Sequence, residues 1–533
     1  MSTHFKNLKS YILIATAFVC ALSMHSQNIV WEQTFGGSDN DDGYGVDATS
    51  DGGVILIGTT KSIDGDVTGN HGSDDIWVAK LSAAGELEWQ KCFGGEYSDT
   101  GSSIIETNDG GYIFCGITFS ENTGDISGYH AGGDVWVVKI SSEGTLVWQK
   151  CLGGSSSDFG LEVSENSEGS YFVAGVTLSN DGDVTGYEGI NGDGWVVKLS
   201  TTGEIIWEKT LGGTDDDYMN CVQATSDGGC ITAGYSFSTD GDVTNHIESS
   251  DCWVVKLSNS GAIEWQKILG GNMQEEVISL TVTPDGGYVF ASFTASTDIV
   301  DTPLQGANDF YISKLSSTGE IVWQNCLGST GAEIPKSIRN TSDGALIVSG
   351  FRLVTPVDGD VSEEIGGYAD IWIIKISANG DLIWERTYGG TGNAYESAES
   401  ITVVPGGYVF VGRTNSNDVD IQSGNNGMQD LWAVKIDDLT IDVFDEAFEA
   451  TPIKTFPVPA ENQVTLSLSL SEPAIITYSI CDLRSQTLIT SKSINSNSGN
   501  LNLSQDISSL VSGVYLLKTT INEKELTSKI LVR

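Results

Sequence analysis

Pairs of aspartates two residues apart carry the clearest chemical potential in this chain. The tripeptide Asp-Gly-Asp supplies four pairs: Asp64 and Asp66, Asp181 and Asp183, Asp240 and Asp242, and Asp358 and Asp360. Two carboxylates with this spacing, together with loop carbonyl oxygens, suit a hard cation such as calcium. The loops lack the regular aspartate spacing and the bidentate glutamate of an EF-hand. A glycine turn whose aspartates accept backbone hydrogen bonds explains the same pattern, so calcium binding and turn capping both stay open.

Other signs of catalytic or metal chemistry are weak. Beyond residue 26 the chain has three histidines, His71, His130 and His246, and a zinc site needs three or four converging ligands. We therefore interpret them as loop residues. The sequence contains no nucleophile-elbow, zinc-protease or Walker motif. With 60 carboxylates in the repeat region, a pair suited to glycoside hydrolysis arises by chance. The sequence thus predicts no catalytic residue and no cofactor other than calcium.

Cysteine usage favours buried free thiols over disulfides or a metal site. Eight cysteines lie beyond the first 26 residues. Three of them, Cys92, Cys151 and Cys326, occupy a repeat position that holds threonine or isoleucine in the other units. Cysteine at this position fills a slot for small side chains.

Tryptophans reveal the repeat that must position the acidic loops. One series opens phrases such as WQKCFGG at intervals of 58 to 61 residues: Trp31, Trp89, Trp148, Trp207, Trp265, Trp323 and Trp384. A second aromatic series lies upstream of the next phrase: Trp77, Trp136, Trp195, Trp253, Tyr311, Trp372 and Trp432. Seven units with a period of about 59 residues indicate a repeat architecture.

An aspartate and a lysine recur in every unit around the second aromatic series. Aspartate stands two residues before it, at Asp75, Asp134, Asp193, Asp251, Asp309, Asp370 and Asp430. Lysine stands three residues after it, at Lys80, Lys139, Lys198, Lys256, Lys314, Lys375 and Lys435. Because a catalytic centre needs one copy rather than seven, we interpret both series as architecture. We expect the aspartates to accept backbone N–H bonds and the lysines to lie along aromatic faces, with their ammonium groups in water or on carboxylates.

Each unit contains four short segments rich in β-branched and aromatic residues, bounded by glycine, serine or aspartate. The four segments of seven units predict 28 strands in a seven-bladed β-propeller, since radial closure hides strand edges. The short link at 82–85 joins the fourth segment of one unit to the first segment of the next, so each blade must combine two units. The last blade then lacks its outer strand, and the strand near 29–35 is predicted to pair antiparallel with the strand near 431–436.

The same link predicts where the tryptophans point. With Ser82 opposite Gly85, Trp89 lies opposite Val78 and Trp77 lies opposite Gln90. Side chains opposite each other share a face, and successive residues alternate. The two tryptophans are therefore expected on opposite faces of one blade, so that each gap between blades receives both series.

Charge restricts the ligands that the protein can attract. The chain has 26 Lys+Arg against 72 Asp+Glu and a formal net charge of −46. About −43 of this falls in the repeat region. Such a surface repels nucleic acid and anionic lipid and attracts cations. Residues 1–26, with two lysines before a short apolar stretch, are predicted to be a signal peptide. We expect no nucleic-acid partner and no transmembrane segment.

The repeat phrases resemble a known family. The succession of Trp, GGS, an acidic turn, DGG and DxWVVKLS is similar to the β-propeller repeats of secreted bacterial proteins called SBBP repeats, over roughly residues 28–436. It also faintly resembles the tryptophan-docking repeats of quinoprotein propellers. The resemblance implies a fold and says little about the ligand, because propellers host unrelated functions.

The C-terminal end resembles a second known module. FPVP from Phe456, GVYLL from Gly513 and a final KILVR are similar to the type A sorting domain of the type IX secretion system. Family members usually read Phe-Pro-Asn-Pro, and this chain has Val458 in place of asparagine. The resemblance implies a small immunoglobulin-like β-sandwich, handling by the type IX secretion machinery, and an extracellular or outer-membrane surface location in a Gram-negative bacterium.

These observations predict a signal peptide over 1–26, a seven-bladed β-propeller over 27–436, an acidic linker over 437–454 and a sorting domain over 455–533. The preferred function is a non-enzymatic binding or adhesion module with an unidentified extracellular glycan or protein ligand. An extracellular enzyme acting on polysaccharide, with its site on one propeller face, is the alternative. A structural spacer is the third hypothesis.

Overall fold

The computed structural model describes residues 29–438 and 454–532, with gaps at 188, 190, 248, 300–303, 354–356, 364, 392–394, 457–462, 471–473, 482–486, 491–493, 497–498, 509, 511–512 and 522–523. The predicted signal peptide and most of the predicted linker lie outside the described residues. The chain divides into two compact units, Met1–Asp438 and Leu439–Arg533.

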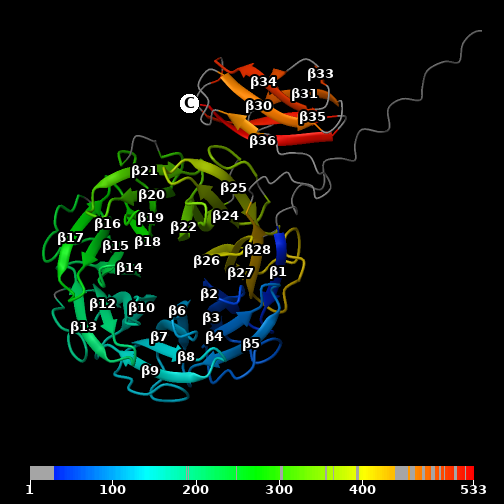
Figure 1. The fold of residues 1–533 in the computed structure, drawn as a ribbon. Coiled ribbons are helices and arrows are strands. Elements are labelled where there is room, and N and C mark those ends of the chain that lie inside the picture. Colours follow the sequence, from blue (N-terminus) through cyan, green and yellow to red (C-terminus); the bar gives the residue numbers. More distant parts are fainter. Residues whose placement is uncertain are drawn as a thin grey trace, which may run out of the picture. The chain divides into compact units, whose positions relative to one another are not determined.

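The first unit is a ring of seven four-stranded antiparallel sheets, which confirms the predicted seven-bladed β-propeller (Figure 1). Blade 1 contains β2 (Asp41–Ala48), β3 (Val54–Thr60), β4 (Asp75–Leu81) and β5 (Leu87–Phe93). Blade 2 contains β6 (Asp99–Glu106), β7 (Tyr112–Thr118), β8 (Asp134–Ile140) and β9 (Leu146–Leu152). Blade 3 contains β10 (Asp158–Glu165), β11 (Tyr171–Thr177), β12 (Asp193–Leu199) and β13 (Ile205–Leu211).

The next four blades repeat this order from the inner to the outer edge. Blade 4 contains β14 (Asp217–Ala224), β15 (Cys230–Ser236), β16 (Asp251–Leu257) and β17 (Ile263–Leu269). Blade 5 contains β18 (Glu275–Val282), β19 (Tyr288–Thr294), β20 (Asp309–Leu315) and β21 (Ile321–Leu327). Blade 6 contains β22 (Glu333–Asn340), β23 (Leu346–Leu353), β24 (Ala369–Ile376) and β25 (Leu382–Tyr388). Blade 7 contains β26 (Ser397–Val404), β27 (Gly407–Thr414), β28 (Asp430–Asp437) and β1 (Ile29–Phe35).

The N-terminal strand closes the ring, as the segment count predicts. β1 pairs antiparallel with β28, from Ile29 opposite Ile436 to Phe35 opposite Leu431. The outer strand of blade 7 therefore comes from residues 29–35, and its other three strands come from residues 397–437 (Figure 1). Closure in this way leaves no blade with three strands.

The predicted register of the β4–β5 hairpin is wrong by two residues. Trp77 lies opposite Cys92, and Trp89 lies opposite Lys80. The turn is longer than predicted, because Ser82 N donates to Glu86 O, and the pairing also shifts between Lys80 and Leu81. A shift of two residues preserves the faces, since side chains alternate with a period of two. The prediction that the two tryptophans leave opposite faces of the blade therefore holds.

Seven hydrophobic clusters fill the gaps between neighbouring blades. In the gap between blades 1 and 2, half-buried Trp89 packs with Trp136, which is fully buried. Trp77 instead packs against blade 7, in the cluster that also receives Trp31. The gap between blades 1 and 2 and the gap between blades 7 and 1 thus each receive one tryptophan from each series, as predicted. Burying an aromatic side chain contributes about 1.5–3 kcal/mol, so these contacts hold neighbouring blades together.

Six of the seven outer-strand tryptophans also pack on a glycine at the hairpin turn of the following blade, the exception being Trp384, since blade 7 takes its outer strand from β1. An added Cβ at Gly85 would lie 2.6 Å from the Trp31 ring, and one at Gly144 would lie 2.9 Å from the Trp89 ring. Trp31 Nε1 donates to a carbonyl of the same turn, that of Ala83, at 3.2 Å. The residue that follows each outer-strand tryptophan forms a hydrogen bond with an aromatic side chain of the second series. Gln90 Oε1, for example, accepts from Trp77 Nε1 at 2.8 Å.

The recurring aspartates and lysines are architectural, as their sevenfold occurrence predicts. The aspartates at the start of the third strand of each blade, here called strand-start aspartates, accept backbone N–H bonds, as Asp75 does from His71 N at 2.8 Å. In blades 1, 2, 4, 5 and 6 the lysine ammonium group lies on a carboxylate of the turn between the first two strands, whereas Lys198 of blade 3 donates to Asn259 and to the Gly228 carbonyl. Lys139 Nζ lies 2.9 Å from Asp109 Oδ1, and the Lys139 side chain is only 4% exposed.

The second unit contains two sheets, which confirms the predicted small β-sandwich. One sheet contains β29 (Lys454–Phe456), β30 (Gln463–Leu470) and β34 (Gly499–Asp506). The other contains β31 (Ala474–Cys481), β32 (Thr487–Thr490), β33 (Ile494–Ser496), β35 (Gly513–Ile521) and β36 (Lys524–Val532). Side chains from both sheets, such as Leu466 and Leu517, share one core.

Candidate functional site

The Asp-Gly-Asp loops connect the second and third strands of blades 1, 3, 4 and 6, so the structure does not bring the four together. Each first aspartate accepts a backbone N–H at the start of its own blade. Asp64 Oδ1 accepts from Ser38 N at 2.7 Å, and Asp181 Oδ1 accepts from Ser155 N at 2.7 Å. Asp240 and Asp358 accept in the same way from Thr214 and Thr330.

The second aspartates lie beside the glycine that follows an outer strand. Asp66 Oδ2 accepts from Gly36 N at 3.3 Å, and Asp183 Oδ2 accepts from Gly153 N at 3.4 Å. The loops therefore perform the capping role that the turn interpretation predicts. Among the described residues, no group of three or more His, Cys, Asp or Glu side chains is arranged to hold a metal ion. Calcium binding by these loops stays a prediction.

The three histidines do not converge, in agreement with their interpretation as loop residues. Each contacts a strand-start aspartate: His71 Nδ1 lies 2.7 Å from Asp75, and His130 Nδ1 lies 2.8 Å from Asp134. His246 makes the same kind of contact at 3.5 Å in blade 4. Sequence analysis missed this pairing, although His71 and His130 both stand four residues before their aspartates.

All eight cysteines beyond residue 26 are buried and free, as the slot argument predicts. Burial raises the pKa of the Cys92 and Cys151 thiols to about 12. Thiols that stay protonated are poor nucleophiles and poor metal ligands. These positions therefore contribute to packing.

One group of side chains breaks the sevenfold pattern near the ring axis, and sequence analysis missed it. It consists of Asp42, Lys336, Tyr395, Glu399 and Arg413, here called the arginine–tyrosine patch. The residues come from blades 1, 6 and 7, at the start of innermost strands or the end of a second strand. These innermost strands surround the ring axis (Figure 1).

The patch is held together by charge pairs and aromatic contacts. The Arg413 guanidinium lies 5.1 Å from the Tyr395 ring centroid, and its Nη1 lies 3.7 Å from Asp42 Oδ1. Lys336 Nζ lies 3.0 Å from Glu399 Oε2. All five side chains are half-buried. The patch therefore presents donors, acceptors and an aromatic face to the same region.

Two further aromatic rings extend the patch. The Tyr395 ring lies 5.4 Å from that of Phe351 and 6.3 Å from that of Tyr368, between centroids. Tyr368 is 62% exposed. An exposed tyrosine beside a tilted pair of aromatic rings offers an apolar ring face with a polar end.

Burial and neighbouring charges set the protonation states in the patch. Burial raises the pKa of Asp42, and Arg413 opposes that rise. Burial, followed by the Asp42 charge, raises the pKa of Tyr44 to about 12. Tyr44 thus keeps its proton at neutral pH and remains a hydrogen-bond donor beside Asp42.

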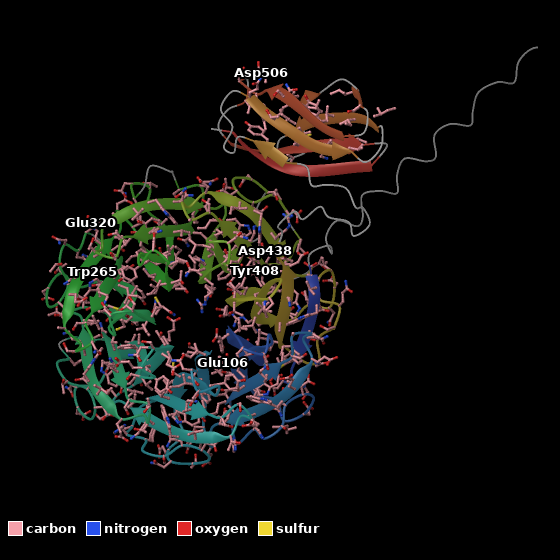
Figure 2. All side chains as sticks on the ribbon, viewed as in Figure 1. Glu106, Trp265, Glu320, Tyr408, Asp438 and Asp506 are labelled. Carbon is pink, nitrogen blue, oxygen red and sulfur yellow. The ribbon has the colours of Figure 1, made fainter. Side chains whose placement is uncertain are left out.

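Two carboxyl groups on innermost strands, those of Glu162 and Asp47, have strongly raised pKa values. Burial raises the pKa of Glu162 to about 7 and that of Asp47 to about 6, while Arg339 lowers both. Glu162 Oε2 accepts from Val222 N at 2.7 Å, and Asp47 Oδ2 accepts from Glu106 N at 3.0 Å. Glu106 lies close to the ring axis, whereas Trp265 lies near the outer rim (Figure 2). Carboxyl groups with a pKa near neutrality are candidates for proton transfer.

The distribution of arginine is the signal that could have found these residues. All four arginines between residues 27 and 438 fall in blades 6 and 7: Arg339, Arg352, Arg386 and Arg413. A residue type confined to two of seven units marks where the units stop being equivalent.

No helix in the described part of the chain has the length and apolar character needed to cross a membrane. No curated protein matches the chain at a significant level.

Solved structures give only remote likenesses. A putative gluconolactonase is 11% identical, with a TM-score of 0.34, over 77% of this chain and 93% of its own. A mutant of the Synechocystis apocarotenoid oxygenase is 12% identical, with a TM-score of 0.37, over 65% of this chain and 72% of its own. Puromycin hydrolase is 14% identical, with a TM-score of 0.42, over 82% of this chain and 60% of its own. Scores this low carry no argument about function.

The C-terminal unit has a specific match. Residues 454–533 match the family described as the secretion system C-terminal sorting domain. This match confirms the resemblance found in the phrases FPVP and GVYLL, despite Val458. The chain is therefore a β-propeller protein that carries a secretion system C-terminal sorting domain.

Proposed function

We propose that the propeller is a non-enzymatic extracellular binding module and that the arginine–tyrosine patch is its ligand site. The observation that carries the proposal is the departure of Arg413 from the repeat. The equivalent residues in blades 1 to 6 are Thr59, Ile117, Val176, Tyr235, Phe293 and Phe351. A single ligand on a sevenfold ring needs a site that occurs once, and Arg413 supplies one.

The chemistry of the patch supports a glycan ligand. The charges of Arg413 and Lys336 are balanced by Asp42 and Glu399 at 3.7 and 3.0 Å, so the patch has little net charge of its own. Paired donors and acceptors of this kind suit hydroxyl groups. The exposed ring of Tyr368 offers a face on which a sugar ring can pack. A protein ligand is the competing occupant.

The sorting domain supports delivery outside the cell by the type IX secretion machinery, to the cell surface or the medium of a Gram-negative bacterium. We infer that residues 1–26 act as the export signal, that 27–436 form the propeller and that 437–454 act as an acidic linker before the sorting domain at 455–533. Deletion of 439–533 is expected to leave a folded ring that stays in the cell envelope. Normal surface delivery of the truncated protein would contradict the sorting role.

A glycan and matrix-protein screen tests the proposed function. The mature chain should bind a restricted set of glycans without releasing products. Tyr368→Ala should weaken binding about two- to tenfold, because packing on an aromatic ring contributes about 0.5–1.5 kcal/mol. Tyr97→Ala, at a 49% exposed tyrosine of blade 2, is the matched control and should bind normally. Equal loss in both variants would refute the assignment of the site.

An extracellular enzyme remains the second candidate because of Glu162. Burial raises the pKa of the Glu162 carboxyl to about 7, and a carboxyl group that keeps its proton near neutral pH is what the general acid of a glycoside hydrolase requires. Release of reducing sugar by the wild type, and its loss in Glu162→Gln with unchanged glycan binding, would favour this candidate. Binding without turnover favours the binding module.

A further inference from the structure

A second group of half-buried side chains breaks the repeat, in blades 4 and 5. It consists of Asp216, Tyr218, Tyr235, Phe237 and Glu276, here called the tyrosine-pair site. The rings of Tyr218 and Tyr235 are stacked, with centroids 4.6 Å apart and planes 15° apart. The Phe237 ring meets that of Tyr235 edge-on at a centroid distance of 6.0 Å. The site therefore combines aromatic rings with polar groups, as the arginine–tyrosine patch does.

The tyrosine pair lies on the same face of the ring as the patch. Tyr218 pairs with Tyr235 at the register position where Ser397 pairs with Arg413 in blade 7. In the other blades this pair of positions never holds two aromatic side chains. Equivalent positions in a propeller lie on one face and at one distance from the axis. Since β14 and β26 lie on opposite sides of the axis, the tyrosine pair lies across the axis from Arg413 (Figure 1).

Polar groups of the tyrosine-pair site are left without protein partners. Among the described residues, no hydrogen bond reaches the hydroxyl groups of Tyr218 and Tyr235 or the carboxyl group of Glu276. The buried Oδ1 atom of Asp216 also lacks a partner. Burial, followed by nearby carboxylate charges, raises the pKa of both tyrosines, so both hydroxyl groups keep their protons. The site thus holds two donors and two acceptors that water or a ligand must satisfy.

Aromatic side chains continue along the same strand position between the two sites. Blade 5 has Phe293 there, which is half-buried, and blade 6 has Phe351. The Phe351 ring lies 5.4 Å from that of Tyr395 in the arginine–tyrosine patch. In blades 1, 2 and 3 the position holds Thr59, Ile117 and Val176 instead. The aromatic residues therefore form an arc over blades 4, 5 and 6 that ends at the patch.

Charge and geometry together restrict what can occupy this arc. A single sugar cannot contact sites on opposite sides of the ring axis, whereas a chain of several sugars can follow the arc. Hydroxyl groups suit the free donors and acceptors, and sugar rings pack on aromatic faces. The repeat region carries a net charge of about −43, which repels polyanions. These requirements describe an uncharged polysaccharide, and an extended peptide is the competing occupant.

We propose that the ligand is an uncharged polysaccharide chain that contacts the arginine–tyrosine patch and the tyrosine-pair site together. The inference rests on the proposed function, because the patch supplies one of the two contacts. The chain passes over blades 5 and 6, where Phe293 lies between the two sites. Once one site is occupied, contact with the other becomes intramolecular, so affinity increases with chain length.

Calorimetric titration of the mature protein with sugars of two lengths tests the proposal. The probes are cellohexaose, xylohexaose and mannohexaose, with cellobiose, xylobiose and mannobiose as their short counterparts. We expect at least one hexasaccharide to bind at least tenfold more tightly than its disaccharide. An anionic alginate hexasaccharide should bind more weakly than that probe.

Two substitutions of Tyr235 separate binding from folding. Tyr235→Ala should remove most of the advantage of the hexasaccharide over the disaccharide. Tyr235→Phe keeps the ring and removes the free hydroxyl group, so it should keep the wild-type thermal midpoint and bind the hexasaccharide about two- to tenfold more weakly. Tyr97→Ala, at an exposed tyrosine of blade 2, is the control and should bind both lengths as the wild type does.

The outcomes distinguish this inference from the proposed function. Equal affinity for the two lengths, or hexasaccharide binding that neither Tyr235 variant weakens, would overturn the second contact while leaving a glycan site at the patch. Tighter binding of alginate than of every uncharged probe would overturn the uncharged ligand. Binding of a matrix protein such as collagen, with no binding of any sugar, would refute the glycan function itself.

Discussion

Trp89 of blade 1 lies directly over Gly144 in the hairpin turn of blade 2, so close that a Cβ on Gly144 would lie 2.9 Å from the indole ring. Gly144 has a φ of +74°, which favours glycine. The outer-strand tryptophan of blade 1 thus packs directly against the backbone of blade 2. The contact explains why a glycine ends the turn in each hairpin that receives a tryptophan.

Gly144→Ala should destabilise the ring more than its backbone strain alone requires. Gly110 of the same blade has a φ of +80° with no atom within 4 Å of its added Cβ, so it provides the matched control. We expect Gly110→Ala to cost about 1 kcal/mol from the left-handed backbone. Gly144→Ala should cost about 1–3 kcal/mol more, because Trp89 must move. Equal urea midpoints for the two variants would contradict the contact.

Trp136→Ala should destabilise the protein by about 3–5 kcal/mol, since it removes a fully buried aromatic side chain. The cavity opens between blades 1 and 2, so hydrogen exchange should accelerate in those two blades before the others. Val147→Ala, at a 60% exposed residue of the next strand, is expected to change stability by less than about 0.5 kcal/mol. Uniform acceleration around the ring would argue against a local inter-blade contact.

Asp109→Asn should reduce stability at pH 5 but not at pH 2. Hydrogen bonds from Thr107 and Lys139 lower the pKa of Asp109 to about 2, although burial opposes them. A folded-state pKa below the unfolded value of about 4 gives stability that is present above pH 4 and lost as the pH falls toward 2. Chemical denaturation from pH 5 to pH 2 should show the variant and wild type converging. Glu320→Gln, at an exposed residue of the outer rim (Figure 2), should follow the wild type.

Glu162→Gln should show the opposite pH dependence. Burial raises the pKa of Glu162 to about 7, above the unfolded value of about 4.3, so the folded state holds this proton more tightly. The contribution of this group to the wild-type free energy of unfolding is fully present below pH 4 and is lost as the pH rises toward 7. The stability of the variant relative to wild type should therefore increase from pH 4.5 to pH 7. A constant difference would show that Glu162 ionises normally in the folded ring.

Much of the fold follows from short-range patterns. The spacing of Trp89, Trp148 and Trp207 predicts the blades, and the unpaired first segment predicts closure by β1. The β4–β5 register was wrong because the bond from Ser82 N to Glu86 O makes the turn longer than its glycine suggests. The partner of Lys139 was not predicted, since it lies in a turn 30 residues upstream.

The candidate site was not predictable in the same way. Asp42 and Arg413 are 371 residues apart in sequence and meet only because the ring closes. The confinement of arginine to blades 6 and 7 marks Arg413 as unusual, but it does not identify Asp42 as its partner. The pairing of His71 with Asp75 was missed for another reason, because the loop before each third strand varies in composition from blade to blade.

The most direct measurement of the central claim is a quantitative comparison of ligand binding by two variants of the mature protein. Arg413→Ala removes the guanidinium that stands where the other six blades have an uncharged residue, whereas Lys150→Ala removes a cation of the repeat whose partner is Glu204 at 2.9 Å. We predict that Arg413→Ala loses the glycans bound by the wild type, with a fall in affinity of at least tenfold, and that Lys150→Ala keeps them. Unchanged binding by Arg413→Ala, or equal loss in both variants, would contradict a ligand site at the arginine–tyrosine patch.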